Sequence, residues 1–582
     1  MYRRLLKEVK EFKKPAMLTP VFMTLEVICE MVIPFLMASI IDNGVNAGDM
    51  SHIIKMGAAM IIIAILGLLT GLAGGRTAAK ASTGFARNVR ESMFNNIQTF
   101  SFSNIDKFST AGLVTRLTTD VNNVQMAFQM IIRMGVRAPL CMIVAMIMAF
   151  TINARLASIY LVAVFILGGI LLLIMKNATK YFQQAFPKYD DMNASVQENV
   201  SAIRVVKAYV REEEETKKFK KTSENIYKIF TKAENVIIYN APAMQATVYT
   251  CILLISWIGA KMIVAGSLTT GEMMSLLAYC MNILMHLMML SMLFVMITMS
   301  EASARRISEI LEEKSDLSNP ENPVFEVADG SIEFKNVDFY YQKDAEHRVL
   351  KEVNLKINSG ETIGIVGGTG SAKTSLVNLI SRLYDVSAGE ILVGGRNVKE
   401  YDMDTLRNQV SVVLQKNVLF SGTILENLRW GDKNATQEEC ERACRLACAD
   451  EFIQKFPDGY NTFIEQGGSN VSGGQKQRLC IARALLKKPK ILILDDSTSA
   501  VDTATDAKIR KAFAEEIPNT TKLIIAQRIS SVQNADRIIV MDEGMINGFG
   551  THEELLETND IYREVYESQT QGGGDFDENG GE

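Results

Sequence analysis

The sequence lacks three features that would each indicate a functional class: an excess of charge of one sign, a disulfide-type cysteine pattern and a cleavable leader. Its 582 residues carry 61 lysines and arginines against 66 aspartates and glutamates, so no overall basic field favours nucleic acid as a partner. The eight cysteines lie in apolar runs or recur at helical spacing with no histidine nearby, which argues against disulfides and metal sites. The start, MYRRLLKEVKEFKK, is basic and amphipathic and is followed by no small-residue cleavage site, so we expect no signal peptide.

The average composition conceals two unlike regions. Hydrophobic residues make up 48% of the chain and charged residues 22%, and the mean hydropathy is +0.10. Such a chain is too apolar to be disordered and too charged to lie wholly in a bilayer. Its length corresponds to roughly four domains of about 150 residues each. We therefore expect a membrane part and a water-soluble part in one chain.

Six stretches in the first half of the chain are long and apolar enough to cross a bilayer, whose core of about 30 Å needs roughly 20 helical residues. The third stretch is short between Arg137 and Arg155, but these side chains can extend to the membrane surface. Residues 1–305 are thus predicted to form an all-α membrane domain. Its spans are expected near residues 15–41, 54–76, 134–154, 156–176, 235–262 and 272–300.

The distribution of lysine and arginine predicts that both termini face the cytoplasm. Residues 1–14 hold six of them, residues 76–133 hold seven and residues 176–232 hold twelve, whereas the opposite connections hold three. The two long basic loops have helical patterning rather than the glycine and proline content of coil. We therefore expect the spans to continue into the cytoplasm as long helices.

Two features of the spans are candidates for substrate contact. Glu26 and Glu30 are four residues apart and share a helix face inside the first span, where a costly carboxylate binds a cation, pairs with an arginine or merely solvates a water-filled cavity. The sixth span carries nine methionines between Met273 and Met299, whose flexible side chains suit a pocket for varied ligands and equally suit ordinary packing. The methionines that we single out are Met285, Met289, Met292 and Met296.

The second half of the chain changes character. Residues 306–330 form a predicted linker, which begins as a charged amphipathic helix and is then interrupted by proline. Between residues 331 and 565, short β-branched runs alternate with helical segments, which predicts an α/β domain. Residues 566–582 are acidic and rich in glycine, so we expect a disordered tail.

The first chemical landmark of this domain is ETIGIVGGTGSAKTSLVNLI, which predicts a strand, a glycine-rich loop and a helix. Backbone amides of such a loop close around phosphates at the helix N-terminus, Lys373 adds a positive charge for the β- and γ-phosphates, and Thr374 offers a hydroxyl to Mg²⁺. Glycine is usual where Ala372 stands, and we expect a right-handed backbone there, in which a methyl group is tolerated. The predicted phosphate-binding residues are Gly367, Gly368, Thr369, Gly370, Ser371, Ala372, Lys373, Thr374 and Ser375.

The second landmark is NVSGGQKQR at residues 470–478, followed by an apolar strand at residues 491–494 and then Asp495 and Asp496. The order of P-loop, VVLQKN with Gln415, VSGGQ and strand-aspartate resembles the ATPase domain of ABC transporters. Six spans with long cytoplasmic helices ahead of this domain resemble the exporter-type half-transporters of that family. The resemblance covers the chain from about residue 1 to residue 565.

The resemblance implies roles for the matching residues. Tyr341 would stack on adenine, with packing as its alternative role, and Asp495 would hold Mg²⁺ together with Thr374 and Gln415. Bends near residues 110–113 and 208–213 are where the family places short helices against ATPase domains. The VSGGQ signature would grip the γ-phosphate of ATP across a dimer interface, so that one chain completes no site alone. Its residues are Ser472, Gly473, Gly474 and Gln475.

Two positions depart from the family pattern. The family usually has a glutamate after the Mg²⁺-binding aspartate and a histidine some thirty residues later, whereas this chain has Asp496 and Gln527. Aspartate has one methylene group fewer than glutamate, so its carboxylate reaches about one bond length less far. A misplacement near 1 Å can cost about 100-fold in rate. Glutamine donates a hydrogen bond but carries no imidazolium charge. Because the ATP- and Mg²⁺-binding groups are retained, we expect a site that binds nucleotide and hydrolyses it slowly.

The intact signature then predicts a partner that uses it. We interpret the chain as one subunit of a heterodimeric, ATP-driven exporter in a bacterial inner membrane, whose non-identical partner supplies the glutamate and histidine and carries an altered signature. The expected cargo is an amphipathic, drug-like compound moved by alternating access. Two alternatives remain open: a lipid or peptide exporter, and a nucleotide-regulated channel or regulatory subunit. Import is disfavoured, because importers usually keep spans and ATPase on separate chains.

Overall fold

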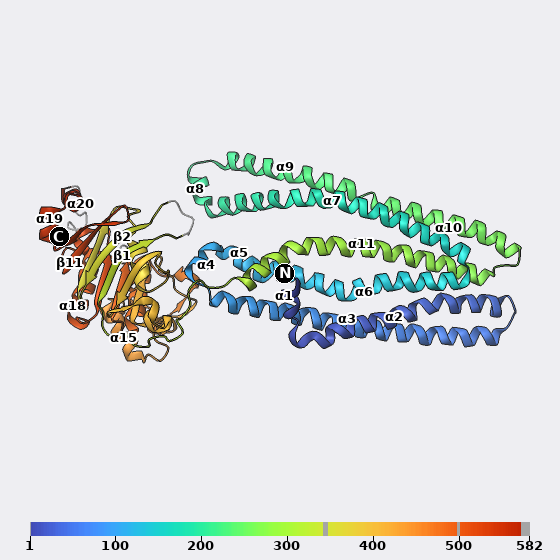
Figure 1. The fold of residues 1–582 in the computed structure, drawn as a ribbon, viewed down its shortest axis with the longest axis horizontal. Helices are drawn as coiled ribbons and strands as arrows, with labels where there is room; N and C mark the ends of the chain where they lie inside the picture. The colour runs from blue at the N-terminus through green and yellow to red at the C-terminus, as the bar shows by residue number, and fades with distance from the viewer. Residues whose placement is uncertain (1, 342–346, 498–500, 572–582) are drawn as a thin grey trace. The chain divides into compact units, whose positions relative to one another are not determined.

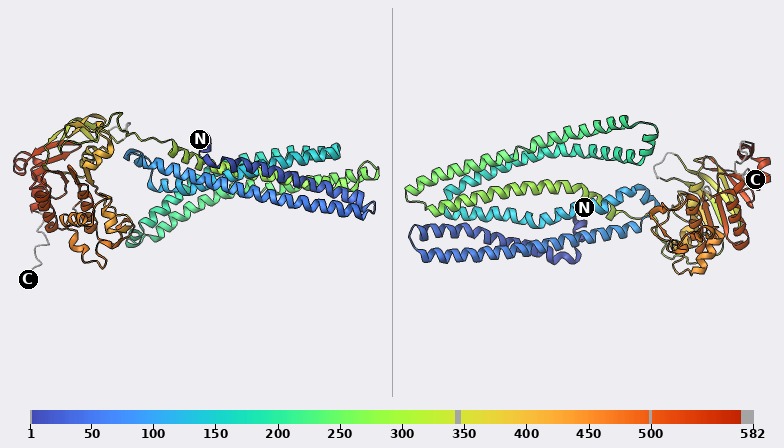
Figure 2. Two further views of the ribbon diagram at one scale, coloured as in Figure 1. Left: turned by 90° about the horizontal axis from the view of Figure 1, so that it is seen from below. Right: turned by 180° about the vertical axis from the view of Figure 1, so that it is seen from behind.

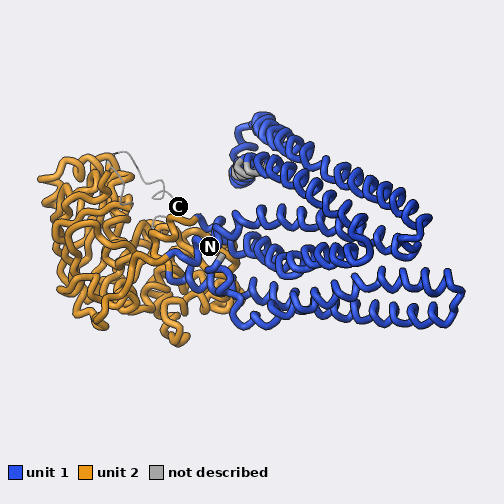
Figure 3. The backbone as a smooth tube through the Cα atoms, turned by 45° about the vertical axis from the view of Figure 1, so that its right-hand side comes forward, with its two compact units in different colours: residues 1–99, 109–313 blue, residues 100–108, 314–582 orange. Residues whose placement is uncertain are grey.

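The computed structural model describes residues 2–341, 347–497 and 501–571, and the chain forms two compact units (Figure 3). Unit 1 comprises Met1–Thr99 and Ser109–Glu313, and unit 2 comprises Phe100–Phe108 and Lys314–Glu582. In the described ranges, unit 1 is built from helices alone and every strand lies in unit 2. The sequence therefore leaves unit 1 for nine residues, contributes them to unit 2 and returns.

Unit 1 is a bundle of long helices that run side by side (Figures 1 and 2). Many of these helices begin at a polar capping residue. The side chain of Asp49 accepts hydrogen bonds from the amides of Ser51 and His52, and Thr269 forms a capping box with Glu272. The elements are α1 (Tyr2–Lys7), η1 (Lys10–Phe12), α2 (Lys13–Ser39), η2 (Ile40–Val45), α3 (Met50–Gln98), α5 (Thr110–Thr115), η3 (Arg116–Asp120), α6 (Val121–Ile152), α7 (Ala154–Ser201), α8 (Ile203–Ala208), α9 (Glu212–Ile237), α10 (Asn240–Val264) and α11 (Thr270–Glu312).

Six helical stretches among the described residues are long and apolar enough to cross a membrane. The third predicted span, residues 134–154, extends two residues too far. Its helix ends at Ile152 because Asn153 adopts an extended backbone and its side chain caps α7 through the amides of Arg155 and Leu156. The six stretches are Lys10–Val45, Met50–Gln98, Thr110–Ile152, Ala154–Tyr181, Glu212–Val264 and Thr270–Glu312.

The predicted continuation of the spans as long helices is confirmed. Helices α3 and α7 contain 49 and 48 residues, which at about 1.5 Å per residue is more than twice the thickness of a bilayer core. Two buried tyrosines tie the bundle together by donating hydrogen bonds to backbone carbonyls of other helices. Tyr160 of α7 donates to Leu276 O at 2.9 Å, and Tyr279 of α11 donates to Met31 O at 2.8 Å. Unit 1 is therefore held by polar links as well as by apolar packing.

Unit 2 is the predicted α/β domain. Its larger sheet has the order β12-β11-β3-β10-β9-β6, in which all neighbours are parallel except β11 and β12, and its smaller sheet has the antiparallel order β2-β1-β4-β5. The strands are β1 (Ile332–Phe339), β2 (Leu350–Ile357), β3 (Thr362–Gly367), β4 (Ala388–Val393), β5 (Arg396–Asn397), β6 (Val410–Val413), β7 (Gly422–Thr423), β8 (Phe463–Ile464), β9 (Ile491–Asp495), β10 (Thr521–Ile525), β11 (Arg537–Asp542) and β12 (Met545–Gly550).

Helices flank these sheets and fill unit 2. The strands β3, β10 and β9 are almost wholly buried, which explains their continuous apolar sequences. The helices are α4 (Phe102–Lys107), α12 (Lys373–Ile380), η4 (Val398–Glu400), α13 (Met403–Gln409), α14 (Ile424–Leu428), α15 (Gln437–Leu446), α16 (Asp450–Ile453), η5 (Gly459–Asn461), η6 (Gln466–Gly468), α17 (Gly473–Leu486), α18 (Thr503–Glu516), η7 (Ile529–Ser531), α19 (His552–Thr558) and α20 (Asp560–Gln571).

Three predicted boundaries are corrected. The linker does not begin at residue 306, because α11 continues to Glu312 and buries Ile307 and Ile310. The tail does not begin at residue 566, because α20 continues to Gln571; residues 572–582 lie outside the described residues. In the first loop it is α4 that belongs to unit 2, and it begins about eight residues before the predicted bend at residues 110–113, which starts α5 of unit 1. The second predicted bend overlaps the end of α8 in unit 1.

Candidate nucleotide-binding site

The loop between β3 and α12 has the backbone of a phosphate cradle. Gly367 has φ +152°, and a Cβ there would lie 2.2 Å from Met541 O, so only glycine fits. Gly370 has φ +87° and faces open space, so its requirement is one of backbone conformation. The turn leads directly into α12 at Lys373, which places helix N-terminal amides at the end of the loop.

The expectation of a right-handed backbone at Ala372 is wrong. Ala372 has φ +71° and ψ +24°, the left-handed region, where an L-residue is strained by roughly 1–2 kcal/mol. The loop imposes this conformation because the chain must turn sharply between Gly370 and the first residue of α12. The glycine usual at this position is therefore explained by backbone geometry, and the alanine here costs stability.

We expect Ala372→Gly to stabilise unit 2 by about 1 kcal/mol, because glycine relieves the left-handed strain. The greater conformational entropy of glycine in the unfolded chain offsets part of this gain. Thermal unfolding of the purified chain measures the shift. A matched control is Ala514→Gly, at an exposed position within α18, where glycine should destabilise by roughly 0.5–1 kcal/mol. The two substitutions should therefore move the melting temperature in opposite directions, and equal shifts would contradict the argument.

Lys373 occupies the centre of the loop. Its Nζ donates to Gly367 O at 2.9 Å, to Gly368 O at 2.8 Å and to Ser371 Oγ at 3.3 Å. Burial lowers the pKa of Lys373, whereas the carboxylates of Asp495 and Asp496 act in the opposite direction. The ammonium is thus held by backbone carbonyls and is poised to meet anionic oxygens.

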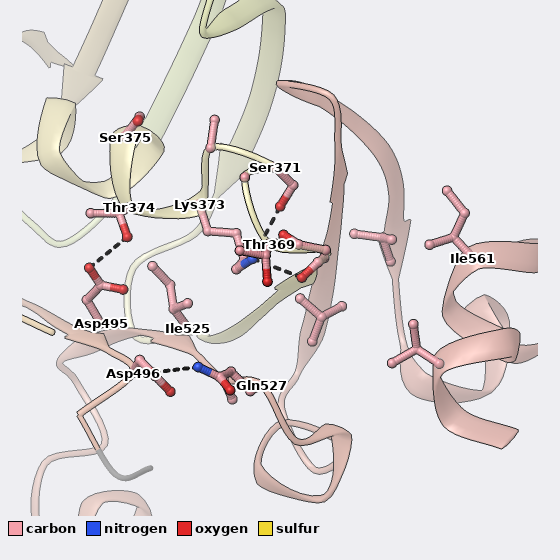
Figure 4. A pocket seen from close by; sticks show the side chains of 18 of the residues that line it. Thr369, Ser371, Lys373, Thr374, Ser375, Asp495, Asp496, Ile525, Gln527 and Ile561 are labelled. Carbon is pink, nitrogen blue, oxygen red and sulfur yellow. Dashed lines mark hydrogen bonds between the residues drawn. The ribbon is translucent and has the colours of Figure 1, made fainter. Parts of the chain in front are cut away.

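The proposed Mg²⁺ ligands lie together. Thr374 Oγ1 donates to Asp495 Oδ2 at 2.9 Å, at the end of β9 (Figure 4). Asp495 is 2% exposed, and burial raises the pKa of its carboxyl group. Gln415 lines the same cavity. A carboxylate, a hydroxyl and an amide oxygen are the hard donors that Mg²⁺ prefers, so these residues fit the ion. Bound here, Mg²⁺ would supply positive charge beside the buried carboxylate of Asp495.

The two residues that depart from the family pattern are bonded to each other. Gln527 Nε2 donates to Asp496 Oδ2 at 2.7 Å (Figure 4). Asp496 has φ +48°, a left-handed conformation that aspartate tolerates better than most residues. The main chain around Gln527 is held in turn by Gln569 of α20, which donates to Gln527 O and accepts from the amide of Ile529, both at 2.9 Å. The Gln527 side of the pair is therefore held in place by α20.

A cavity of about 590 Å³ joins these parts. All nine predicted P-loop residues line it, as do Gln415, Asp495, Asp496 and Gln527. Helix α20 adds an apolar wall, which the motifs did not predict because this helix lies far from them in the sequence. The one sequence feature that indicates an apolar face of α20 is the four-residue spacing of Ile561 and Val565. The unpredicted lining residues are Val349, Val366, Ile525, Ala526, Ile529, Val540, Ile561, Tyr562 and Val565.

Tyr341 lies beside the P-loop helix. Its hydroxyl and Ser375 Oγ are 2.8 Å apart, and its ring, 42% exposed, packs edge-on against Phe339 and Tyr384. Tyr341 is absent from the lining of the 590 Å³ cavity, so its stacking on adenine stays a prediction.

The VSGGQ signature forms the start of α17. Ser472 Oγ accepts from the amide of Gln475, and Gln475 Oε1 accepts from the amide of Ser472, which makes a capping box. Ser472 and Gly473 are exposed, and none of the four signature residues lines the cavity at the P-loop. Within one chain the signature and the P-loop therefore remain separate surfaces.

Comparisons with known proteins agree with this arrangement. The family model described as the ABC transporter transmembrane region matches residues 17–288, and the model described as ABC transporter matches residues 350–499. The uncharacterized ABC transporter ATP-binding protein YfiB of Bacillus subtilis is 36% identical over 567 residues, which are 97% of this chain and 98% of YfiB. The chain belongs to the ABC transporter family.

This ABC transporter has two further informative likenesses. The ATP-dependent lipid A-core flippase of Desulfotalea psychrophila is 33% identical over 488 residues, covering 83% of this chain and 84% of the flippase. The structure of a bacterial Atm1-family ABC exporter with ATP bound matches with a TM-score of 0.84 at 23% identity, over 96% of this chain and 99% of that one. The chain thus consists of an ABC transporter membrane domain fused to an ABC ATPase domain, and it shares the fold of that exporter.

In the membrane domain of this ABC transporter, the two carboxylates of the first span share one arginine. Arg137 of α6 lies 2.9 Å from Glu30 Oε2 and 3.5 Å from Glu26 Oε1. A Cβ on Gly71 of α3 would lie 3.1 Å from the Glu26 carboxylate, so the cluster is packed where three helices meet. Glu26 Oε2 accepts no hydrogen bond from the residues that the structure describes. Arginine pairing is therefore present, and one acceptor oxygen is left over.

Two neighbouring cavities lie along α7 and α11. The first, about 370 Å³, is apolar and includes Leu171 and Phe294; the second, about 430 Å³, includes Asn240 and Arg305, and both include Met175. The predicted substrate methionines Met285, Met289, Met292 and Met296 line neither cavity. At about 3.6 residues per turn, these four methionines share one side of α11. The α11 residues that line the first cavity lie on the opposite side of the helix.

Proposed function

We propose that this chain is the subunit of a heterodimeric exporter whose own site binds ATP and Mg²⁺ and hydrolyses ATP slowly. The hydrogen bond between Gln527 and Asp496 carries the proposal. The two side chains occupy the positions where the family usually has the water-orienting glutamate and the phosphate-contacting histidine, and here they satisfy each other. Aspartate reaches less far than glutamate, and glutamine brings no positive charge to a developing phosphate anion.

The rest of the site supports binding without fast hydrolysis. Lys373, Thr374 and Asp495 are present in the arrangement described above, so the phosphates and Mg²⁺ have their ligands. Random loss of function would alter these residues as readily as the two that differ. The site is therefore suited to hold nucleotide and, by doing so, to keep the two ATPase domains partly closed between transport cycles.

The intact signature at Ser472 to Gln475 implies the partner. In the proposed pair it caps the P-loop of a non-identical half-transporter that carries the glutamate and histidine and has an altered signature of its own. Hydrolysis at that second site drives alternating access. We further propose that both termini are cytoplasmic and that the pair lies in a bacterial inner membrane, which the lysine and arginine distribution and the bacterial relatives support.

The purified chain without the partner tests this proposal. We expect it to bind ATP with Mg²⁺ and to hydrolyse it at a small fraction of an ordinary transporter rate, because no glutamate or histidine orients water in either of two paired copies. Phosphate release and the integrity of bound nucleotide measure this directly. A Lys373→Ala variant, which should lose ATP binding, controls for contaminating ATPases. Hydrolysis by the unmodified chain at ordinary transporter rates would refute the degenerate-site proposal.

For cargo, we propose amphipathic, drug-like compounds. An apolar cavity that shares Met175 with a second cavity containing Arg305 and Asn240 suits molecules with an apolar body and a polar end. The Glu26 oxygen that accepts no hydrogen bond from the described residues suits a cation. Lipid export is the second candidate, favoured by the same pair of cavities and by the likeness to a lipid A-core flippase. Stimulation of the ATPase of the reconstituted pair by drugs or by lipids separates these two, whereas ATP-dependent ion current without stimulation would indicate a channel.

A further inference from the structure

The short helix α4 is part of the ATPase unit although its neighbours in sequence belong to the membrane unit (Figure 3). Side-chain hydrogen bonds between described residues hold it there. Ser103 Oγ donates to Asp316 Oδ2 at 2.7 Å, Asn104 Nδ2 donates to Lys314 O at 3.1 Å, and Tyr384 OH donates to Asp106 Oδ2 at 2.7 Å. The first two involve the segment that leads into unit 2, whereas the third reaches the body of the ATPase domain. Tyr384 therefore links α4 to the body of the ATPase domain.

Tyr384 connects α4 to a cluster of aromatic rings. Its ring contacts Phe102 of α4 at 6.0 Å between centroids, Phe339 at 5.7 Å and Tyr341 at 5.1 Å, and the Tyr341 contact is edge-to-face at 87°. Burial and the bond to Asp106 raise the pKa of the Tyr384 phenol, so the hydroxyl remains a hydrogen-bond donor at neutral pH. One side chain thus joins the loop helix to the ring that is predicted to stack on adenine.

The other end of the cluster reaches the P-loop helix. The Tyr341 hydroxyl lies 2.8 Å from Ser375 Oγ, and Ser375 is buried in the first turn of α12, next to Thr374. A continuous chain of contacts therefore runs from Asp106 through Tyr384 and Tyr341 to α12. In the predicted arrangement, the phosphates of ATP would contact Lys373 and Thr374, and the base would contact Tyr341.

We propose that Tyr384 is a positioning residue through which adenine stacking on Tyr341 and docking of α4 favour each other. The inference rests on the proposed function only in taking Tyr341 as the base-stacking ring. When α4 is docked, Asp106 fixes Tyr384, and the edge of Tyr384 fixes the Tyr341 ring in one orientation, so that less freedom is lost when a base stacks. By linkage, a bound base strengthens α4 docking by the same factor. The loop between spans two and three therefore senses the base of the nucleotide.

Binding of two ligands to the full-length purified chain tests this inference. We expect Tyr384→Phe and Asp106→Ala, which remove the donor and the acceptor of this bond, each to weaken ATP binding by about fivefold, at the low end of typical couplings between sites. The double variant should weaken it no further. Binding of Mg²⁺-tripolyphosphate, which has no base, should stay unchanged in all three. Tyr340→Phe is the matched control, because it removes a neighbouring hydroxyl that accepts from Arg348 and should change neither ligand. Equal losses for both ligands, or no loss for either, would overturn the inference.

Hydrogen exchange of residues 100–108 gives an independent readout. ATP should slow exchange in this segment more than Mg²⁺-tripolyphosphate does, and Tyr384→Phe should remove the difference. A Tyr341→Ala variant separates the two levels of the proposal. If it binds ATP no more weakly than the unmodified chain does, the stacking role of Tyr341 is wrong. If it weakens ATP binding while the Tyr384 and Asp106 variants do not, the stacking role stands and the link to α4 is wrong.

Discussion

Replacing Asp496 by glutamate and Gln527 by histidine in the same chain is expected to raise ATP hydrolysis by the purified protein by about 100-fold. If two copies pair with each intact VSGGQ signature facing the other copy's P-loop, the substituted pair would have every group that the family uses. Glutamate restores about one bond length of reach, and misplacement near 1 Å can cost about 100-fold. Histidine restores a group that can be charged beside the γ-phosphate.

Phosphate release under saturating ATP measures this gain. Each single substitution should give only part of it, because Gln527 holds the carboxylate at position 496 and a lone change leaves the other partner unsuited. Asp496→Asn with Gln527→His is the matched control, since it supplies the histidine without a carboxylate and should remain slow. If the double variant binds ATP, pairs normally and is no faster than the unmodified chain, the slow site has another cause.

A second large effect is expected in the complete heterodimer. Gly473→Asp, which places a carboxylate at the exposed start of α17, should lower ATP turnover of the pair by roughly 100-fold. In the proposed heterodimer the signature of this chain caps the site that hydrolyses, and a negative charge there would repel the γ-phosphate. Lys373→Ala should lower turnover only severalfold, because it empties the slow site.

The ratio of these two losses is the informative quantity. Steady-state phosphate release by the reconstituted pair, with the same two substitutions made in turn in the partner, gives the full comparison. In the partner the order should reverse, so that its P-loop lysine matters more than its signature. Equal losses from Gly473→Asp and Lys373→Ala would mean that both sites hydrolyse, and the division of labour proposed here would be incorrect.

The part of the site that was predictable from the sequence is the part made by consecutive residues. The strand, the loop and the first two residues of the helix follow one another between Thr362 and Thr374. Their motif specifies which side chains face the phosphates. Asp495 follows an apolar strand in the same way. These positions line one cavity because the strands β3 and β9 end at the same edge of one parallel sheet.

The errors arise where the surrounding fold decides. The backbone at Ala372 was expected to follow the preference of alanine, but the turn between Gly370 and α12 imposes a left-handed conformation, and the loop keeps it at a cost. The wall formed by α20 depends on a helix that begins about 190 residues after the P-loop, and no local pattern identifies what that helix covers. The position of α4 depends on Tyr384, which no helical periodicity in the first loop could reveal.

The placement of α4 also sets the timing of biosynthesis. Asp106 and Tyr384 are 278 residues apart in sequence, and at typical rates of synthesis the ribosome needs on the order of tens of seconds to make that length of chain. During this interval the last four of the six spans are synthesised, and α4 has not yet met Tyr384. Because α4 belongs to the ATPase unit, the unit can be completed only if the loop between spans two and three lies on the same side of the membrane as the ATPase domain. Docking of α4 therefore depends on correct membrane topology.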